Sequence, residues 1–177
     1  MSNHGPTQRV FFALWPDEPT RRECARLLRS MPRRRGRSVA EENLHITLAF
    51  IGSVDDAMLR CLLARAAQIR AKSFSLALTR VGYFARAKVL WLGPESCPAP
   101  MQGLVQRLNE GLSHCGYHPD SRPFAAHLTL FRKAQPSKSK IEISPVQWRV
   151  KVFCLVESRA YPQGVRYHVL RRYPLVP

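Results

Sequence analysis

Two short segments of the chain nearly repeat one another. Residues 44–48 read Leu-His-Ile-Thr-Leu, and residues 126–130 read Ala-His-Leu-Thr-Leu. Because side chains alternate along an extended strand, each segment places its histidine and threonine on one face and its aliphatic residues on the other. Burial in a core explains the aliphatic face, but it does not explain the repeated His and Thr, since Val or Tyr suits a strand better. The repeat therefore predicts two strands that share one chemical task.

The rest of the chain has the pattern of a protein with segregated helices and strands. It shows no regular alternation of strand and helix and no glycine-rich phosphate loop, which excludes a doubly wound nucleotide-binding sheet. The predicted fold class is α+β, with seven or eight strands and three helices. Polar residues 1–8 are expected to form a flexible tail. Hydrophobic periodicity predicts helices at 17–31, 55–70 and 99–114, and strands at 10–14, 44–51, 74–78, 88–92, 127–131, 146–156 and 165–171.

The chain carries a large positive charge. Its 28 Lys and Arg against 12 Asp and Glu give a net charge of +16, and 45% of its 177 residues are hydrophobic. This composition supports a buried core and favours an anionic partner or substrate, which includes RNA, DNA, nucleotides and acidic membrane surfaces. Charge alone does not distinguish among them. No run of about 18 apolar residues occurs, so we expect no membrane-spanning helix.

The cysteines and the start of the chain bear on the compartment. The first residues lack an apolar segment of signal-peptide length, and the five cysteines are scattered without a C-x-x-C pair. We therefore expect reduced thiols and a cytoplasmic protein. His114, Cys115 and His118 come nearest to a metal cluster, but their spacing matches no zinc motif, and the end of a helix explains them better.

Two histidines fit the hydrolysis of a phosphate diester. The ordinary pKa of an imidazole is about 6.5, so one ring can be neutral while another is protonated near neutral pH. The neutral ring takes a proton from the attacking water, and the protonated ring gives one to the departing oxygen. Each transfer contributes about 10²–10⁴-fold to the rate. Threonine hydroxyls beside the rings can donate to the non-bridging phosphate oxygens, and the reaction requires no metal or other cofactor.

At these residues the chain resembles the 2H phosphoesterases, a family with two His-x-Thr motifs. More closely it resembles the bacterial and archaeal RNA 2′,3′-cyclic phosphodiesterases, also called 2′-5′ RNA ligases. The resemblance covers nearly the whole chain. Beyond the two motifs it rests on the flanks Phe11-Phe12-Ala13-Leu14, Glu42-Asn43, Ala49-Phe50-Ile51-Gly52, Val89-Leu90-Trp91-Leu92-Gly93 and Arg122-Pro123-Phe124.

The resemblance implies a fold, a reaction and a role for each site residue. The fold is two similar lobes of antiparallel sheet and helices around a central cleft. The reaction is hydrolysis of a 2′,3′-cyclic phosphate at an RNA end to a 2′-phosphate, and some members join tRNA halves through 2′-5′ bonds. The implied proton donor is His45 and the proton acceptor is His127. The implied phosphate ligands are Thr47, Thr129 and Arg132.

Several questions stay open at the level of sequence. Ala126 stands where the family has proline, a change that a strand accepts. The arginine loop, residues 33–37 (Arg-Arg-Arg-Gly-Arg), is either a solvated surface loop or a grip on the RNA backbone. The alternative functions are a 2′-5′ RNA ligase, a 2′-5′ oligonucleotide phosphodiesterase and a non-catalytic RNA-binding protein. We expect residues 9–177 to form a single bilobal domain, monomeric and not bound to membranes, that acts on RNA ends such as those of tRNA fragments.

Overall fold

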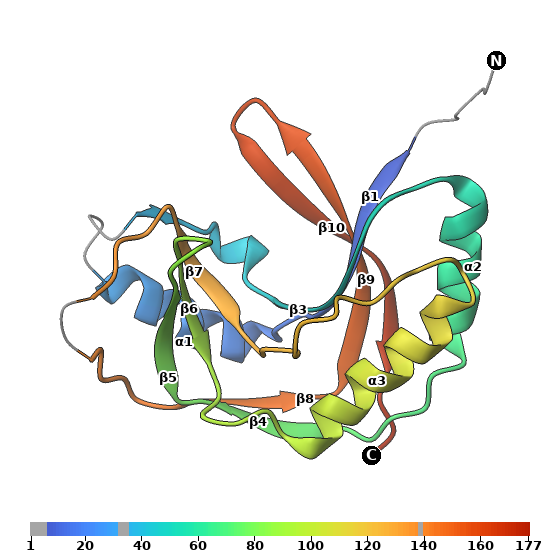
Figure 1. Ribbon diagram of the computed structural model, residues 1–177. Coiled ribbons are helices and arrows are strands. Elements are labelled where there is room, and N and C mark those ends of the chain that lie inside the picture. Colours follow the sequence, from blue (N-terminus) through green and yellow to red (C-terminus); the bar gives the residue numbers. More distant parts are fainter. Residues whose placement is uncertain (1–6, 32–35, 138–139) are drawn as a thin grey trace.

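The computed structural model describes residues 7–31, 36–137 and 140–177, and it has the α+β fold expected from the sequence. Most strands belong to one antiparallel sheet, and three α-helices pack around it (Figure 1). The elements in chain order are β1 (Gln8–Leu14), α1 (Glu18–Ser30), β2 (Arg37–Ser38), the 3₁₀ turn η2 (Glu41–Asn43), β3 (Ile46–Val54), α2 (Asp56–Ala67), β4 (Phe74–Leu78), β5 (Arg80–Phe84), β6 (Val89–Gly93), α3 (Ala99–Ser113), β7 (Leu128–Arg132), β8 (Val146–Val150), β9 (Val152–Tyr161) and β10 (Gly164–Pro174).

The large sheet consists of two halves. Its strand order is β10-β9-β1-β3-β7-β6-β5, with β2 beside β7, and β4 pairs with β8 in a separate two-stranded sheet. The residue pair Ile46 and Leu128 joins β3 of the first half to β7 of the second. The β9–β10 hairpin extends beyond the rest of the sheet (Figure 1). The two repeated motifs therefore meet at the junction between the halves.

Local sequence signals fix the ends of the helices. The carboxylate of Asp17 accepts a hydrogen bond from the Thr20 amide at 3.1 Å, and that of Asp55 accepts one from the Met58 amide at 2.8 Å. These N-caps satisfy amides that the first turn of a helix leaves without partners. Gly116, with φ at 81°, lies just beyond the last turn of α3, where a left-handed residue ends many helices. The three predicted helices are confirmed close to their predicted bounds.

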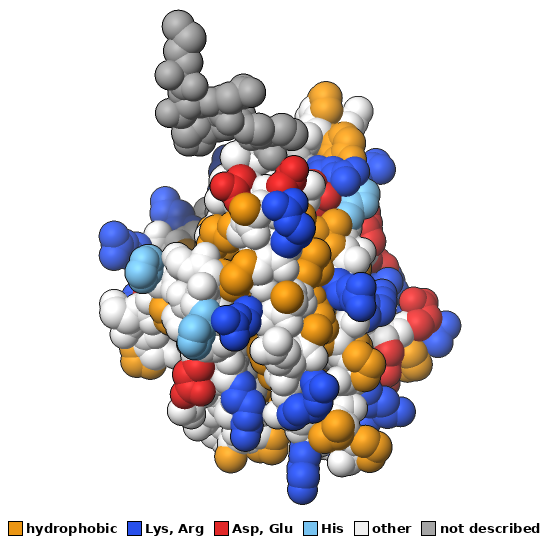
Figure 2. All heavy atoms as spheres, turned by 90° about the vertical axis from the view of Figure 1, so that its right-hand side faces the viewer, with side chains coloured by type: hydrophobic (Ala, Val, Ile, Leu, Met, Phe, Trp, Pro, Cys, Tyr) orange, Lys and Arg blue, Asp and Glu red, His pale blue; other side chains and the backbone are white. Residues whose placement is uncertain are grey.

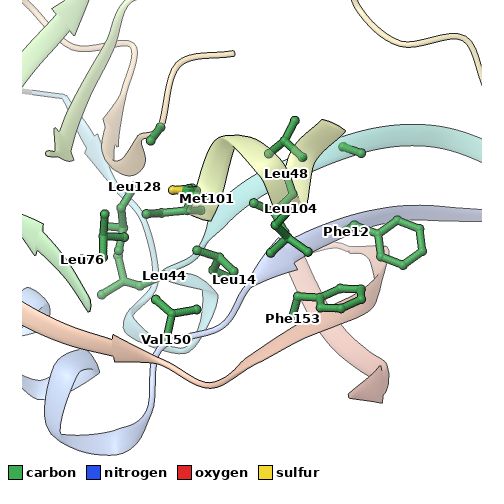
Figure 3. Packing of buried hydrophobic residues seen from close by; sticks show 14 of the residues in the cluster. Phe12, Leu14, Leu44, Leu48, Leu76, Met101, Leu104, Leu128, Val150 and Phe153 are labelled. Carbon is green, nitrogen blue, oxygen red and sulfur yellow. The ribbon is translucent and has the colours of Figure 1, made fainter. Parts of the chain in front are cut away.

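Apolar side chains from both halves pack into one core beneath the sheet. Phe12 of β1 faces Phe153 of β9 with ring centres 6.3 Å apart, and Leu104 of α3 lies beside Leu48 of β3 (Figure 3). The core includes the aliphatic residues of both motifs. These are Leu44, Ile46, Leu48, Leu128 and Leu130, each at most 5% exposed.

Three predictions about strands and the tail need correction. Residues 80–84 form β5, which the sequence did not predict because Gly82 interrupts the apolar alternation. Residues 146–156, expected as one strand, divide at Lys151 into β8 of the small sheet and β9 of the large one. The tail expected at residues 1–8 overlaps β1, which begins at Gln8, and residues 1–6 lie outside the described ranges.

Two of the five cysteines form a disulfide, so the expectation of reduced thiols is wrong for this pair. Cys61 of α2 is bonded to Cys115, which lies just beyond the end of α3. The two cysteines are 54 residues apart in the sequence. The two helices lie side by side on one flank of the molecule (Figure 1). Their packing brings together cysteines that no local motif connects. The remaining cysteines, Cys24, Cys97 and Cys154, are free thiols.

Basic side chains are spread over the surface. Figure 2 shows Lys and Arg scattered over the side that carries α2 and α3, with fewer acidic side chains between them. Some pair with carboxylates, as Arg29 does with Glu41 and Arg159 with Glu157. Within the described ranges, no helix is long and apolar enough to cross a membrane.

Candidate active site

The repeated motifs lie side by side where β3 meets β7. The antiparallel pairing of these strands sets His45 opposite Thr129. It also sets Thr47 opposite His127, on the same face of the sheet. Directly opposed residues on antiparallel strands have Cβ atoms about 4.5–5.5 Å apart. Two histidines and two threonines thus form one compact group, and the two motifs are related by an approximate two-fold axis.

Backbone carbonyls orient both imidazole rings. His45 Nδ1 donates to the carbonyl of Asn43 at 2.6 Å, and His127 Nδ1 donates to the carbonyl of Ala125 at 2.8 Å. Because a carbonyl oxygen only accepts, each Nδ1 carries a proton and each Nε2 is left for proton exchange. His45 Nε2 lies 3.1 Å from Thr47 Oγ1. Both motifs use the carbonyl two residues before the histidine, so the repeat extends to the hydrogen bond that holds each ring.

Aromatic side chains enclose His45. Trp15 stacks on the imidazole with ring centres 5.6 Å apart, and Phe11 lies tilted at 4.9 Å. Tyr167 of β10 presents its edge at 5.1 Å. On the other half of the sheet, Phe84 meets the ring of His127 edge-on at 5.0 Å. These contacts remove much of the water that would solvate a charged imidazole.

The pKa of both histidines lies below its ordinary value. Burial lowers the pKa of His45 from 6.5 to about 4, and the charge of Arg132 acts in the same direction. Burial also lowers the pKa of His127, again assisted by Arg132. Both rings are therefore mainly neutral near pH 7 in the free protein. A bound phosphate raises both pKa values, because its negative charge stabilises an imidazolium.

Two cavities meet at the motif residues. One cavity of about 750 Å³ lies between β2, β3 and the β9–β10 hairpin. The other, about 1230 Å³, lies between α3, the β5–β6 turn and the segment before His127. The residues that line both are His45, Thr47, Phe50, Thr129 and Arg132. His127 lines the larger cavity beside them. The structure therefore brings together all five residues that the sequence predicted for the site, with Arg132 exposed where the cavities join.

Asn43 contributes to the site through contacts that sequence analysis missed. Its buried side chain donates from Nδ2 to the carbonyl of Val165 at 2.8 Å. Its Oδ1 accepts from the amide of Tyr167 at 3.3 Å. Asn43 thereby connects the first motif to the β9–β10 hairpin. The one available signal was its position in the flank of that motif, which gives no indication of the hairpin.

The arginine loop is described in part. Residues 33–35 lie outside the described ranges. Arg37 forms β2, pairs with Arg132 of β7 and lines the smaller cavity. Arg9 of β1 lines the same cavity, a role for which the sequence offered no signal beyond the general excess of positive charge.

At the end of α3, Cys115 and His114 have partners within the chain. Cys115 is engaged in the disulfide, and His114 Nδ1 lies 3.1 Å from the carbonyl of Glu110. In the parts of the chain that the structure describes, no three His, Cys, Asp or Glu side chains are placed together to hold a metal ion. His114 is the C-cap residue of α3, and Cys115 follows it directly.

Known proteins are similar to this chain in sequence and in fold. A family profile for the 2′-5′ RNA ligase superfamily matches residues 15–162. The chain belongs to this superfamily. It is 34% identical to the RNA 2′,3′-cyclic phosphodiesterase of Escherichia coli strain K12 over 173 residues, which covers 95% of this chain and 97% of that protein. It is 30% identical to the protein of the same name from Thermotoga maritima, with 92% of each chain covered.

Solved structures of other proteins have a similar fold. Apo LigT from E. coli superposes with a TM-score of 0.88 at 31% identity, covering 98% of this chain and 100% of LigT. LigT complexed with 3′-AMP gives a TM-score of 0.87 at 32% identity, covering 97% and 100%. TT0787 from Thermus thermophilus gives 0.77 at 26% identity, covering 94% and 97%. The family resemblance and the fold class predicted from the sequence are thus confirmed.

Proposed function

We propose that this protein is an RNA 2′,3′-cyclic phosphodiesterase that converts the cyclic phosphate at an RNA end to a 2′-phosphate. Relatives that match nearly the whole chain carry this name. The observation that carries the proposal is the β3–β7 register, which gathers both histidines and both threonines on one face. Each imidazole has Nδ1 bound to a carbonyl, which leaves Nε2 as the atom that exchanges a proton; His45 Nε2 lies beside the Thr47 hydroxyl. Two such groups satisfy the two proton transfers of the reaction, which needs no metal.

The reaction assigns one role to each group. Water attacks phosphorus in line with O3′, and His127 Nε2 accepts a proton from that water. The P–O3′ bond breaks, and His45 Nε2 donates a proton to O3′. The products are a 2′-phosphate and a free 3′-hydroxyl. Thr47, Thr129 and Arg132 donate to the non-bridging oxygens and stabilise the charge that develops there.

The lowered pKa of His45 sets a condition on this mechanism. A ring whose pKa is about 4 in the free protein must gain its proton when the anionic substrate binds. His127 is neutral near pH 7 and is therefore ready to act as a base.

The same groups support a second reaction, the joining of RNA ends. A 5′-hydroxyl that attacks in place of water gives a 2′-5′ linkage, with the same proton transfers at His45 and His127. The superfamily match favours this activity as the alternative. Incubation of a cyclic-phosphate RNA with a second RNA bearing a 5′-hydroxyl, followed by sizing of the products, measures it.

The test uses a short RNA that ends in a 2′,3′-cyclic phosphate, incubated with the protein in EDTA. Mass spectrometry is expected to show addition of one water, and nuclease digestion is expected to place the phosphate on O2′. His45→Ala and His127→Ala should each lower the rate by about 10²–10⁴-fold. The matched control is His114→Ala, an exposed histidine on the far end of α3. Undiminished turnover in either motif variant would overturn the roles, and RNA binding without conversion would favour a non-catalytic binding protein.

The proposal also covers the cellular location, the oligomeric state and the domain organisation of the protein. The protein acts in the cytoplasm as a monomer, with the chain from Gln8 onward as one bilobal domain, on RNA ends such as those of tRNA fragments. The two sheet halves that meet at a single residue pair support the bilobal description. Size-exclusion chromatography with light scattering tests the monomer, which an elution mass near 40 kDa, twice the 20.2 kDa chain, would refute.

A further inference from the structure

The smaller cavity carries more positive charge than one reacting phosphate needs. Arg9, Arg37 and Arg132 line it, and none of its described lining residues is Asp or Glu. The ion pairs between described residues engage other arginines. The cavity is therefore a concave surface of uncompensated positive charge that adjoins the two histidines.

Arg37 and Arg132 are direct neighbours across the β2–β7 pair. Like charges at opposed positions on antiparallel strands destabilise the pairing. An anion bound between them offsets this cost. Arg132 lines both cavities beside the motif residues, so its charge lies next to the proposed position of the reacting phosphate. Arg37 is consequently available for a second anion on the side of the cavity away from the histidines.

The β9–β10 hairpin forms the opposite wall of this part of the cavity. Arg37 reaches toward the tip of the hairpin, with Nη2 3.1 Å from the point that a Cβ on Gly164 would occupy. Ser158, Gln163 and Gly164 line the wall, and the hydrogen bonds of Asn43 hold the hairpin in place. Arg37 and the hairpin tip thus lie against one another and together line one end of the cavity, which is continuous with the reaction centre.

We propose that Arg37 and the β9–β10 hairpin form a subsite for the phosphodiester that precedes the terminal nucleotide of the RNA. This inference rests on the proposed function and extends it to substrate selection. The opposed guanidinium groups of Arg37 and Arg132 bind two successive phosphates of one strand, the reacting one at Arg132 and its neighbour at Arg37. The enzyme accordingly prefers an oligonucleotide end to a mononucleoside 2′,3′-cyclic phosphate.

Arg9 also lines the cavity, and the RNA strand could in principle leave the reaction centre on its side instead. Its guanidinium lies 5.0 Å from the ring centre of Phe50, and Phe50 is 52% exposed at the cavity wall. A single guanidinium over an apolar ring provides less positive charge and fewer hydrogen-bond donors for a phosphate than the opposed pair of arginines does. We therefore assign the strand to the Arg37 end, and the experiment includes Arg9 as the discriminating variant.

The experiment compares adenosine 2′,3′-cyclic phosphate with a dinucleotide that ends in the same group. In the wild type, kcat/KM is expected to be roughly tenfold higher for the dinucleotide, the value of one charge-assisted contact. Arg37→Gln should bring this ratio close to one. It should also lower the slope of log KM against log salt for the dinucleotide by about 0.7, the value for one phosphate contact on a single strand. Arg26→Gln, which removes an exposed charge from α1, is the matched control and should retain the ratio.

Three outcomes of this comparison would overturn the subsite. A wild-type ratio near one, a ratio that survives in Arg37→Gln, or a loss confined to Arg9→Gln would each do so. Turnover of neither substrate would refute the proposed function instead. In that case, calorimetric binding of a dinucleotide ending in a 2′-phosphate, compared with adenosine 2′-phosphate, still measures the subsite. A tenfold difference in Kd that Arg37→Gln removes supports the subsite, and equal Kd values in the wild type refute it.

Discussion

The protonation state of His45 follows from its immediate neighbours. Three aromatic rings surround the imidazole and solvate a positive charge less well than water does. The hydrogen bond to the carbonyl of Asn43 favours the charged ring, but burial outweighs it. The residue that donates a proton in the proposed reaction is thus neutral at rest. The negative charge that arrives with the substrate is what switches it to the charged form.

The lowered pKa values of His45 and His127 predict that acid destabilises the fold. Between about pH 6.5 and pH 4 the unfolded chain binds protons at these rings that the folded chain does not, so stability falls as the pH falls through this window. For His45 the loss is on the order of 3 kcal/mol and is complete below its folded pKa of about 4. Urea unfolding of the wild type and His45→Gln at several pH values measures the effect. The variant should lose less stability on acidification, and parallel curves would contradict the shift.

Single residues differ in how far the sequence could identify them. The histidines and threonines of the motifs were predictable because a strand converts a spacing of two into a shared face. Tyr167 was not predictable as a neighbour of His45, because β10 and β3 lie more than a hundred residues apart in the chain. The hydrogen bond from its amide to Asn43 spans 124 residues. The protonation state was not predictable either, since it depends on aromatic rings that the fold brings together.

Among the elements, β5 shows how a glycine that the packing requires can prevent a strand from being recognised in the sequence. Gly82 interrupts the apolar alternation from which a strand is predicted. A Cβ at this position would lie 2.2 Å from Trp91 Cζ2, so the indole of β6 occupies the space that a side chain would need. The glycine is a packing requirement between paired strands. Helices α1 and α2 were predictable because hydrophobic periodicity is a local signal, and their N-caps, Asp17 and Asp55, lie at the predicted starts.

The disulfide between α2 and the end of α3 predicts a loss of stability on reduction. Cys61 and Cys115 close a loop of more than fifty residues, and such a bridge contributes about 2–4 kcal/mol. Cys61→Ser should therefore lower the urea midpoint to that of the reduced wild type. Cys97→Ser, which replaces a half-buried free thiol, is the control. Thiol titration of the unfolded, unreduced protein should find the three free cysteines, and five reactive thiols would contradict the bridge.

In the whole molecule, the narrow junction between the sheet halves carries the chemistry. Each half supplies one motif, and neither motif alone has both an acid and a base. The sequence indicated this division through its near repeat, because a repeat of two strands implies two similar environments. It did not indicate that the motifs share a single residue pair, since register between distant strands depends on the packing of both halves. The cleft is therefore a property of the assembled sheet and of the hairpin that stands beside it.

From this junction we predict that core packing and activity are coupled at Leu128 and not at core positions far from the junction. Leu128→Ala removes a fully buried side chain directly beside His127, so it should lower the free energy of unfolding by about 2–5 kcal/mol. It should also lower kcat, because the residue pair with Ile46 sets the distance between the two imidazoles. Leu108→Ala, an equally buried leucine on α3, should cost similar stability with little change in kcat. Both are measured by urea unfolding and by turnover well below the melting temperature. Equal kcat values for the two variants would show that the junction does not position the catalytic pair.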